Sequence, residues 1–364
     1  MRSIDSRAQL KFLVIRRDNI GDLICTTPVF EALRNRFPAA RIYALTNTYN
    51  LPVLRNNPFV DESFAYTKLK HREPGVSIVR AYWERARLVK RLRAMRIDYV
   101  ILAGGGFLQR ALATARVLGP QHIIGYVEAG ASIRGIDLPV PFDRFTDLHE
   151  VEYVFKLLAP LGIVGAPPPL FLSPSVSERS DAEAAWAKRG VAGRPLGVHI
   201  SARKPTNRWP TERFVALMRR LHAEHGFGFM LFWAPGDAAD PRHPGDDAKA
   251  REILSALSDV PVVPYPTQRL DQLIAGLSIC ERVICSDGGA MHIAAALRKP
   301  ILCFFGNSGA TRWRPWGTSH VLLQPDSLDA GDVSVDEAFA GFQRLLADAI
   351  PATREVQSRT STAF

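Results

Sequence analysis

The sequence lacks the long apolar run that a membrane-spanning helix requires. Among its 364 residues there is no stretch of about 18 or more apolar residues, the length that would indicate a transmembrane helix. The N-terminal segment MRSIDSRAQL has neither an apolar core nor a small-residue cleavage site. We therefore expect no signal peptide, and a protein that stays in the cytoplasm with transient peripheral contact at the inner membrane.

Cysteine is scarce, and the common cofactor motifs are absent. The chain has four cysteines, all in apolar surroundings and without metal-ligand spacing: Cys25, Cys280, Cys285 and Cys303. We expect buried thiols in a reducing compartment, and neither a metal nor another cofactor. The Walker A pattern is missing, and GGGFLQ lacks the G-x-G-x-x-G spacing, so a P-loop nucleotidase and a dinucleotide-binding enzyme are both disfavoured.

Acidic residues are fewer than basic ones, which points to a polyanionic partner. The formal net charge is +10, a balance that suits nucleic acid, anionic lipid or a phosphorylated glycan. Seven cations and one acid lie between residues 80 and 96, on a predicted helix with one apolar side: Arg80, Arg85, Arg87, Lys90, Arg91, Arg93 and Arg96. This helix is either a solvated outer face or a guide toward a phosphorylated lipid. Nucleic-acid-binding motifs are absent, so we expect no nucleic acid partner.

Short apolar runs alternate with helical patterns along the chain. Strands are predicted at residues 12–16, 41–46, 99–106, 196–201, 227–234, 282–286 and 301–306. This alternation favours parallel sheets in an α/β fold, and the length favours two domains. We predict domains at 1–165 and 181–350, a proline-rich linker at 166–180 and a polar tail at 351–364. Ligands of such sheets bind at the carboxyl ends of the strands.

Asp22 follows the first predicted strand, in the stretch RRDNIGDLICTTP. A carboxylate there would face the gap between the domains, where a single general base could take the proton from an attacking sugar hydroxyl. The alternative is a structural role, because aspartate is also a favoured helix N-cap.

Asp287, Gly288, Gly289 and His292 lie between a strand and a helix in the second half, in VICSDGGAMHIAAAL. Paired glycines let backbone N–H groups approach a diphosphate, and Asp287 can accept hydrogen bonds from a sugar or ribose hydroxyl. The alternative is a tight turn with an aspartate N-cap and no ligand.

A third stretch, HISARKPTNRWPTERF, carries the cations Arg203, Lys204 and Arg208 between a strand and a helix. These cations could neutralise a diphosphate leaving group in place of a divalent metal. The alternative is a solvated basic loop.

Taken together, these stretches resemble glycosyltransferase family 9, the heptosyltransferases of lipopolysaccharide core assembly. The motifs that carry the resemblance occur in order: the Arg16–Pro28 opening, the RWP loop, DGGAMHIAAAL from Asp287, and FFGNSGATRWRPWG from Phe304. The resemblance covers roughly residues 11–350 and implies the GT-B fold, in which two Rossmann-like domains face each other across a cleft.

The resemblance also implies roles for residues. Asp22 would be the general base of an inverting, metal-independent transfer of a heptose from an ADP-sugar. The second domain would bind the nucleotide sugar through Asp287, Gly288, Gly289, His292, Arg203, Lys204 and Arg208. The first domain would bind a lipid-linked glycan, and we assign Arg16, Arg17 and Asn19 to that acceptor.

The chain departs from the family pattern around the predicted donor site. Asn207 replaces a frequent lysine, Gly288 a serine or threonine, and Ala290 a proline, while NSGA replaces PTDP. These departures keep open the alternative of a catalytically silent protein that binds nucleotides or glycans. A second alternative keeps the fold and the activity but transfers the sugar to a different surface polysaccharide or to a protein.

Overall fold

The computed structural model describes residues 5, 9–66, 78–143, 146–240 and 245–348. The predicted tail at 351–364 lies outside this part of the chain. No helix in the described residues is long and apolar enough to cross a membrane.

The first domain is built on a parallel sheet in the order β3-β2-β1-β4-β5-β6. Its strands are β1 (Lys11–Ile15), β2 (Arg41–Asn47), β3 (Glu62–Tyr66), β4 (Tyr99–Leu102), β5 (His122–Glu128) and β6 (Leu138–Phe142). The central strand β1 is buried along almost its whole length, because helices cover both faces of a parallel sheet. The helical segments are α1 (Ile20–Ile24), α2 (Thr27–Arg36), η1 (Thr48–Leu54), α3 (Ile78–Ala94), α4 (Gln109–Leu118), α5 (Glu150–Lys156) and η3 (Ala159–Leu161).

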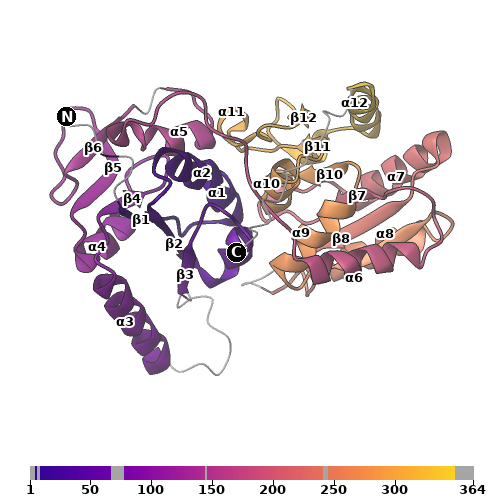
Figure 1. The fold of residues 1–364 in the computed structure, drawn as a ribbon. Helices are drawn as coiled ribbons and strands as arrows, with labels where there is room; N and C mark the ends of the chain where they lie inside the picture. The colour runs from indigo at the N-terminus through magenta and orange to yellow at the C-terminus, as the bar shows by residue number, and fades with distance from the viewer. Residues whose placement is uncertain (1–4, 6–8, 67–77, 144–145, 241–244, 349–364) are drawn as a thin grey trace.

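The second domain repeats this topology, with the order β12-β11-β10-β7-β8-β9. Its strands are β7 (Leu196–His199), β8 (Phe229–Trp233), β9 (Val262–Pro266), β10 (Val283–Ser286), β11 (Ile301–Phe304) and β12 (His320–Leu323). Its helical segments are α6 (Val176–Ala187), η4 (Pro205–Asn207), α7 (Thr211–His225), α8 (Asp247–Ala256), α9 (Leu270–Ile279), α10 (Gly289–Ala296), α11 (Ala310–Trp313), η5 (Ala330–Asp332) and α12 (Val335–Ala347). Both sheets have the Rossmann strand order, which confirms the predicted pair of α/β domains (Figure 1).

Local sequence signals explain where individual helices start and stop. Ser334 caps α12: its hydroxyl accepts from the Glu337 N–H, and the Glu337 carboxylate accepts from the Ser334 N–H (2.8 Å). Gly226 ends α7 in the left-handed conformation, with φ of +69°. The cysteines predicted to be buried are all buried and unpaired.

The proline-rich stretch connects the two domains and packs against the protein. Leu170 and Leu172 are buried, and the Phe171 N–H donates to Thr27 Oγ1 (3.0 Å) on α2. Helix α6 begins at Val176, inside the range predicted as linker, and packs against α9. The chain is therefore anchored on both sides as it passes from one domain to the other.

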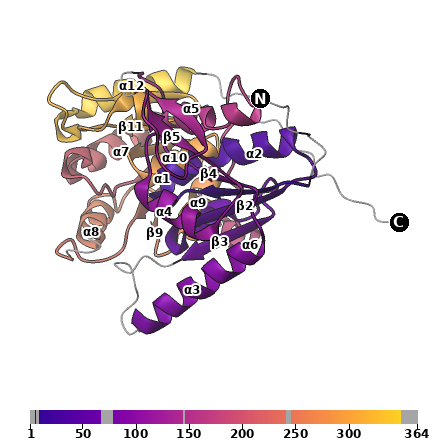
Figure 2. The same ribbon diagram turned by 90° about the vertical axis from the view of Figure 1, so that its left-hand side faces the viewer.

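Helix α3 projects from the first domain, as both ribbon views show (Figures 1 and 2). The predicted helix is present, but its apolar side is exposed near Trp83, which is 58% accessible, and its neighbour Tyr82 is 56% accessible. Leu92, nearer the other end, is buried against the domain. Among the described residues, α3 therefore packs chiefly through its later turns, where it meets α4 and β3.

Candidate active site

The predicted site residues lie at the carboxyl ends of the central strands of both sheets. In each sheet the chain order reverses next to a central strand, between β1 and β4 in the first and between β7 and β10 in the second. Asp22 follows β1, the RWP loop follows β7, and the Asp287–Gly289 turn follows β10. Such switch points are where α/β sheets bind ligands.

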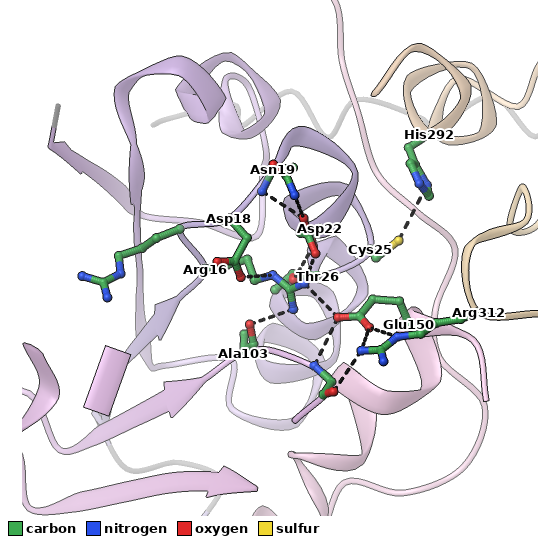
Figure 3. Close-up of polar contacts among 12 residues, drawn as sticks. Arg16, Asp18, Asn19, Asp22, Cys25, Thr26, Ala103, Glu150, His292 and Arg312 are labelled. Atoms are coloured by element: carbon green, nitrogen blue, oxygen red, sulfur yellow. Dashed lines mark hydrogen bonds and ion pairs between the residues drawn. The ribbon is translucent and has the colours of Figure 1, made fainter. Parts of the chain in front are cut away.

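Asp22 lies in α1 and is nearly buried, with its carboxylate held at both oxygens. Oδ2 accepts from the backbone N–H and the side-chain amide of Asn19, each at 2.9 Å. Oδ1 accepts from Nη2 of Arg16, with which it forms an ion pair (Figure 3). Asn19, and not Asp22, is the N-cap of α1. The carboxylate supports that cap from the third position of the helix, so it has a structural role as well as a place in the site.

Two opposing effects act on the pKa of Asp22. Burial would raise it, but the positive charge of Arg16 and the hydrogen bonds from Asn19 outweigh burial, so the pKa lies below its usual range. Asp22 is therefore a charged carboxylate at neutral pH. Among the described residues, Oδ2 accepts from two donors and Oδ1 from Arg16 alone, so Oδ1 retains a lone pair for a further proton.

Helix α1 of the first domain packs directly against α10 of the second. A Cβ on Gly21 would lie 2.8 Å from Nε2 of His292, and one on Gly289 would lie 3.2 Å from Cδ1 of Ile20. Glycine at these positions lets the two helices approach closely. The contact brings Asp22 and the predicted diphosphate turn together, although they are far apart in the sequence.

His292 is buried within this contact. Its Nδ1 lies 3.8 Å from Sγ of Cys25, and its ring meets Trp313 edge-on at 6.0 Å. Burial lowers the pKa of His292 despite the negative charges of Asp287, Asp22 and Glu150, so the imidazole is neutral at neutral pH. We assign it to packing between the domains.

Asn207 ties together the loops that follow β7, β10 and β11. Its Oδ1 accepts from the Gly306 N–H (3.0 Å), and its Nδ2 donates to Oδ2 of Asp287 (3.1 Å). The side chain is 2% exposed. The residue that replaces the family lysine therefore joins these loops, and it orients the Asp287 carboxylate.

The predicted cations are not equivalent in the structure. Lys204 reaches the same cluster as Asn207, with its Nζ donating to Oγ of Ser308 (3.0 Å). Arg208 donates from Nε to the Ala202 carbonyl (3.1 Å) and so stabilises its own loop, whereas the Arg203 side chain is exposed. Beside Gly288 the space is open, because an added Cβ would meet no atom within 4 Å.

The residues predicted for the acceptor have other surroundings. Arg16 is 3% exposed, and its guanidinium donates to Asp22, Glu150 and the Ala103 carbonyl. Arg17 turns toward α4 and donates to Oγ1 of Thr114 (3.0 Å). Arg16 thus supports Asp22 rather than presenting a free cation to a ligand.

Sequence reasoning missed Glu150, which is fully buried between the domains. It accepts from Arg16 of its own domain (2.8 Å) and from Nε of Arg312 in the second domain (2.8 Å), as Figure 3 shows. An acidic residue in the first turn of a helix is usually explained by its interaction with the helix dipole, so the sequence gives no sign of an interdomain role for Glu150. Its hydrogen-bond partners in the structure reveal that role.

Comparison with known proteins supports the family that the sequence motifs resemble. The sequence model of glycosyltransferase family 9 (heptosyltransferase) matches residues 85–332, more than half of the chain. Lipopolysaccharide heptosyltransferase 3 of Escherichia coli K12 is 26% identical over 307 residues, covering 81% of this chain and 82% of that protein.

Solved structures share the fold at low sequence identity. A family 9 glycosyl transferase from Veillonella parvula has a TM-score of 0.77 at 18% identity, covering 95% of this chain and 100% of the other. The structure described as E. coli ADP-heptose lps heptosyltransferase II has a TM-score of 0.71 at 21% identity, covering 93% and 99%. The two domains thus form a GT-B fold, and the chain belongs to glycosyltransferase family 9.

Proposed function

We propose that the protein transfers a heptose, with inversion, from ADP-heptose to a lipopolysaccharide core precursor. The family supports a glycosyltransferase, and the names of similar proteins support this donor and pathway. The observation that carries the proposal is the contact of α1 with α10, which puts a charged carboxylate of one domain next to the glycine turn of the other.

Asp22 acts as the general base in this proposal. As the acceptor oxygen forms its bond to the anomeric carbon, the hydroxyl proton passes to Oδ1, and the bond from that carbon to the diphosphate breaks on the opposite face. Arg16 and Asn19 hold the carboxylate in place throughout. General-base catalysis of this kind contributes about 10²- to 10⁴-fold to the rate.

The second domain stabilises the leaving diphosphate without a metal. The N-terminus of α10 offers backbone N–H groups beside the open space at Gly288, and Lys204 supplies the cation that the family lysine would supply at position 207. Asp287, oriented by Asn207, accepts hydrogen bonds from hydroxyls of the donor. Transfer should therefore continue in excess chelator.

The first domain binds the acceptor, and α3 lies against the anionic surface that carries it. Tyr82 and Trp83 are exposed beside the exposed cations Arg85, Arg87 and Lys90, a combination suited to the headgroup region of a bilayer. Each cation near such a surface contributes about 1 kcal/mol. Reversing the charges at Arg85 and Arg87 should abolish sedimentation with phosphatidylglycerol vesicles and leave the thermal midpoint unchanged.

A donor screen followed by a transfer assay tests the proposed function. ADP-heptose at about 100 times its Kd should stabilise the fold by about 2.7 kcal/mol, while UDP-glucose should not. Radiolabelled heptose should then appear on core-deficient lipopolysaccharide. Stabilisation by ADP-heptose without transfer to any glycan would favour a silent binding protein, and transfer only to another polysaccharide would change the assigned acceptor.

A further inference from the structure

Residues at the start of α5, in the first domain, contact a segment of the second domain that includes α11. Nε2 of His149 donates to the Arg314 carbonyl (2.9 Å), and the His149 ring stacks on Trp316 at 4.6 Å. Burial lowers the pKa of His149 to about 4, so the imidazole is neutral, with Nδ1 free to accept from the Val151 N–H (3.1 Å). A neutral histidine next to Glu150 thus stabilises this contact between the domains.

Glu150 is the carboxylate at this contact, and its hydrogen-bond partners come from three separate segments of the chain. Oε1 accepts from Arg16 (2.8 Å) and from the Gly105 N–H (3.2 Å), while Oε2 accepts from Nε and Nη2 of Arg312 (2.8 and 2.6 Å). Its side chain is 0% exposed. A buried carboxylate is tolerated only when its charge is compensated and its oxygens accept hydrogen bonds. Arg312 supplies the donors to Oε2 and a second cation beside Arg16.

The glycine turn after β4 leaves the space that this ion pair occupies. A Cβ on Gly105 would lie 2.6 Å from Oε2 of Glu150 and would also collide with Nη2 of Arg312. The Gly105 carbonyl accepts from Arg312 (2.9 Å), so the same residue receives the arginine and donates to Glu150.

Charges alternate from Arg312 to Asp22. Arg312 pairs with Glu150, Glu150 with Arg16, and Arg16 with Asp22. Without Arg312, Glu150 and Asp22 would both draw on the single guanidinium of Arg16. With Arg312 in place, Glu150 has its own cation, and Arg16 can remain against Asp22.

We propose that Glu150 and Arg312 are positioning residues that form an interdomain latch, which holds Arg16 and thereby the Asp22 carboxylate in place while the domains are in contact. The contribution of the latch to catalysis rests on the proposed function of Asp22. The mechanical role of the latch, in which the second domain keeps α1 of the first domain ordered, does not depend on that proposed function.

Hydrogen exchange tests the mechanical part without any substrate. In Arg312→Gln, amides of the segment 19–25 should exchange about fivefold faster, because the support for Arg16 is lost. Arg312→Lys, which keeps the charge but not the paired geometry, should show a smaller increase. The matched control is Arg55→Gln, which removes another ion pair between the domains, Arg55–Asp271 (2.6 Å), that shares no residue with the series from Arg312 to Asp22.

Unchanged exchange at 19–25 in Arg312→Gln would overturn the latch. An equal increase in Arg55→Gln would also overturn it, since the effect would then be a general loosening of the interface. Arg312 is partly exposed, with 35% of its side chain accessible, so its replacement should lower stability without preventing folding. An unchanged far-ultraviolet circular dichroism spectrum would verify that the fold is intact.

Steady-state kinetics test the catalytic part. Arg312→Gln should lower kcat roughly 10- to 100-fold with the donor KM within about twofold, as expected when a catalytic group is misplaced. Combining it with Glu150→Gln should lower kcat no further than the worse single variant, because both act through Arg16. An unchanged kcat, or fully multiplicative losses, would refute this role. If the parent transfers no sugar, the proposed function fails while the exchange result still decides the latch.

Discussion

Replacing Gly21 by alanine should force α1 and α10 apart at the contact between the domains. The new Cβ would lie 2.8 Å from Nε2 and 3.0 Å from Cγ of the buried His292 ring, closer than the usual contact distance of about 3.5–4.0 Å. Overpacking of this kind destabilises by about 1–3 kcal/mol. Alanine regains up to about 1 kcal/mol through its higher helix propensity, so the net loss should be about 1–2 kcal/mol.

Urea unfolding in two backgrounds tests this steric argument. Gly21→Ala should lower the free energy of unfolding of the parent, but should be neutral or stabilising in His292→Ala, where the ring is gone. Gly309→Ala is the matched control, since a Cβ there meets no atom within 4 Å and its φ of −68° suits any residue. An equal loss in both backgrounds would refute the proposed clash.

Further predictions concern the donor loops and Asp22. Asn207→Ala should destabilise by about 2–3 kcal/mol in urea, because Gly306 loses a buried hydrogen bond and Asp287 a partly buried one. A loss below about 0.5 kcal/mol would contradict the loop-joining role. Lys204→Met should lower kcat about 10-fold or more at constant stability; an unchanged kcat would remove Lys204 from the site. Because the pKa of Asp22 is lowered from 3.8, its charge contributes stability above about pH 4, and this stability is lost as pH falls through the folded-state pKa. For the same reason, kcat should show no acid limb between about pH 5 and 7. A limb in that window would contradict an Arg16-paired base.

The sequence predicts most of the buried parallel strands but none of the strands at the edges of the sheets. The predicted runs at 12–16 and 301–306 correspond to β1 and β11, which are buried along most of their length. The edge strands β3, β6, β9 and β12 went unpredicted, as did β5, which is buried between β4 and β6. Most residues of the edge strands are exposed or only partly buried, so burial imposes a weaker apolar pattern on their sequences.

The site residues can be predicted from the sequence only where they directly follow a predicted strand. Asp22 and the Gly288–Gly289 turn could be found in this way. The N-cap alternative for Asp22 is wrong, since Asn19 is the N-cap and Asp22 supports it from the third helical position. The pairing of Glu150 with Arg312 spans 162 residues and depends on how the domains meet. No local pattern encodes that contact, so only the three-dimensional structure reveals it.

The account depends most directly on Asp22 as the proton acceptor, and Asp22→Asn removes that capacity with little change in shape. We expect heptose transfer from ADP-heptose to slow by about 10²- to 10⁴-fold, equivalent to about 2.7–5.4 kcal/mol, while the donor Kd stays within about twofold. Transfer by this variant at the parental rate would contradict the account.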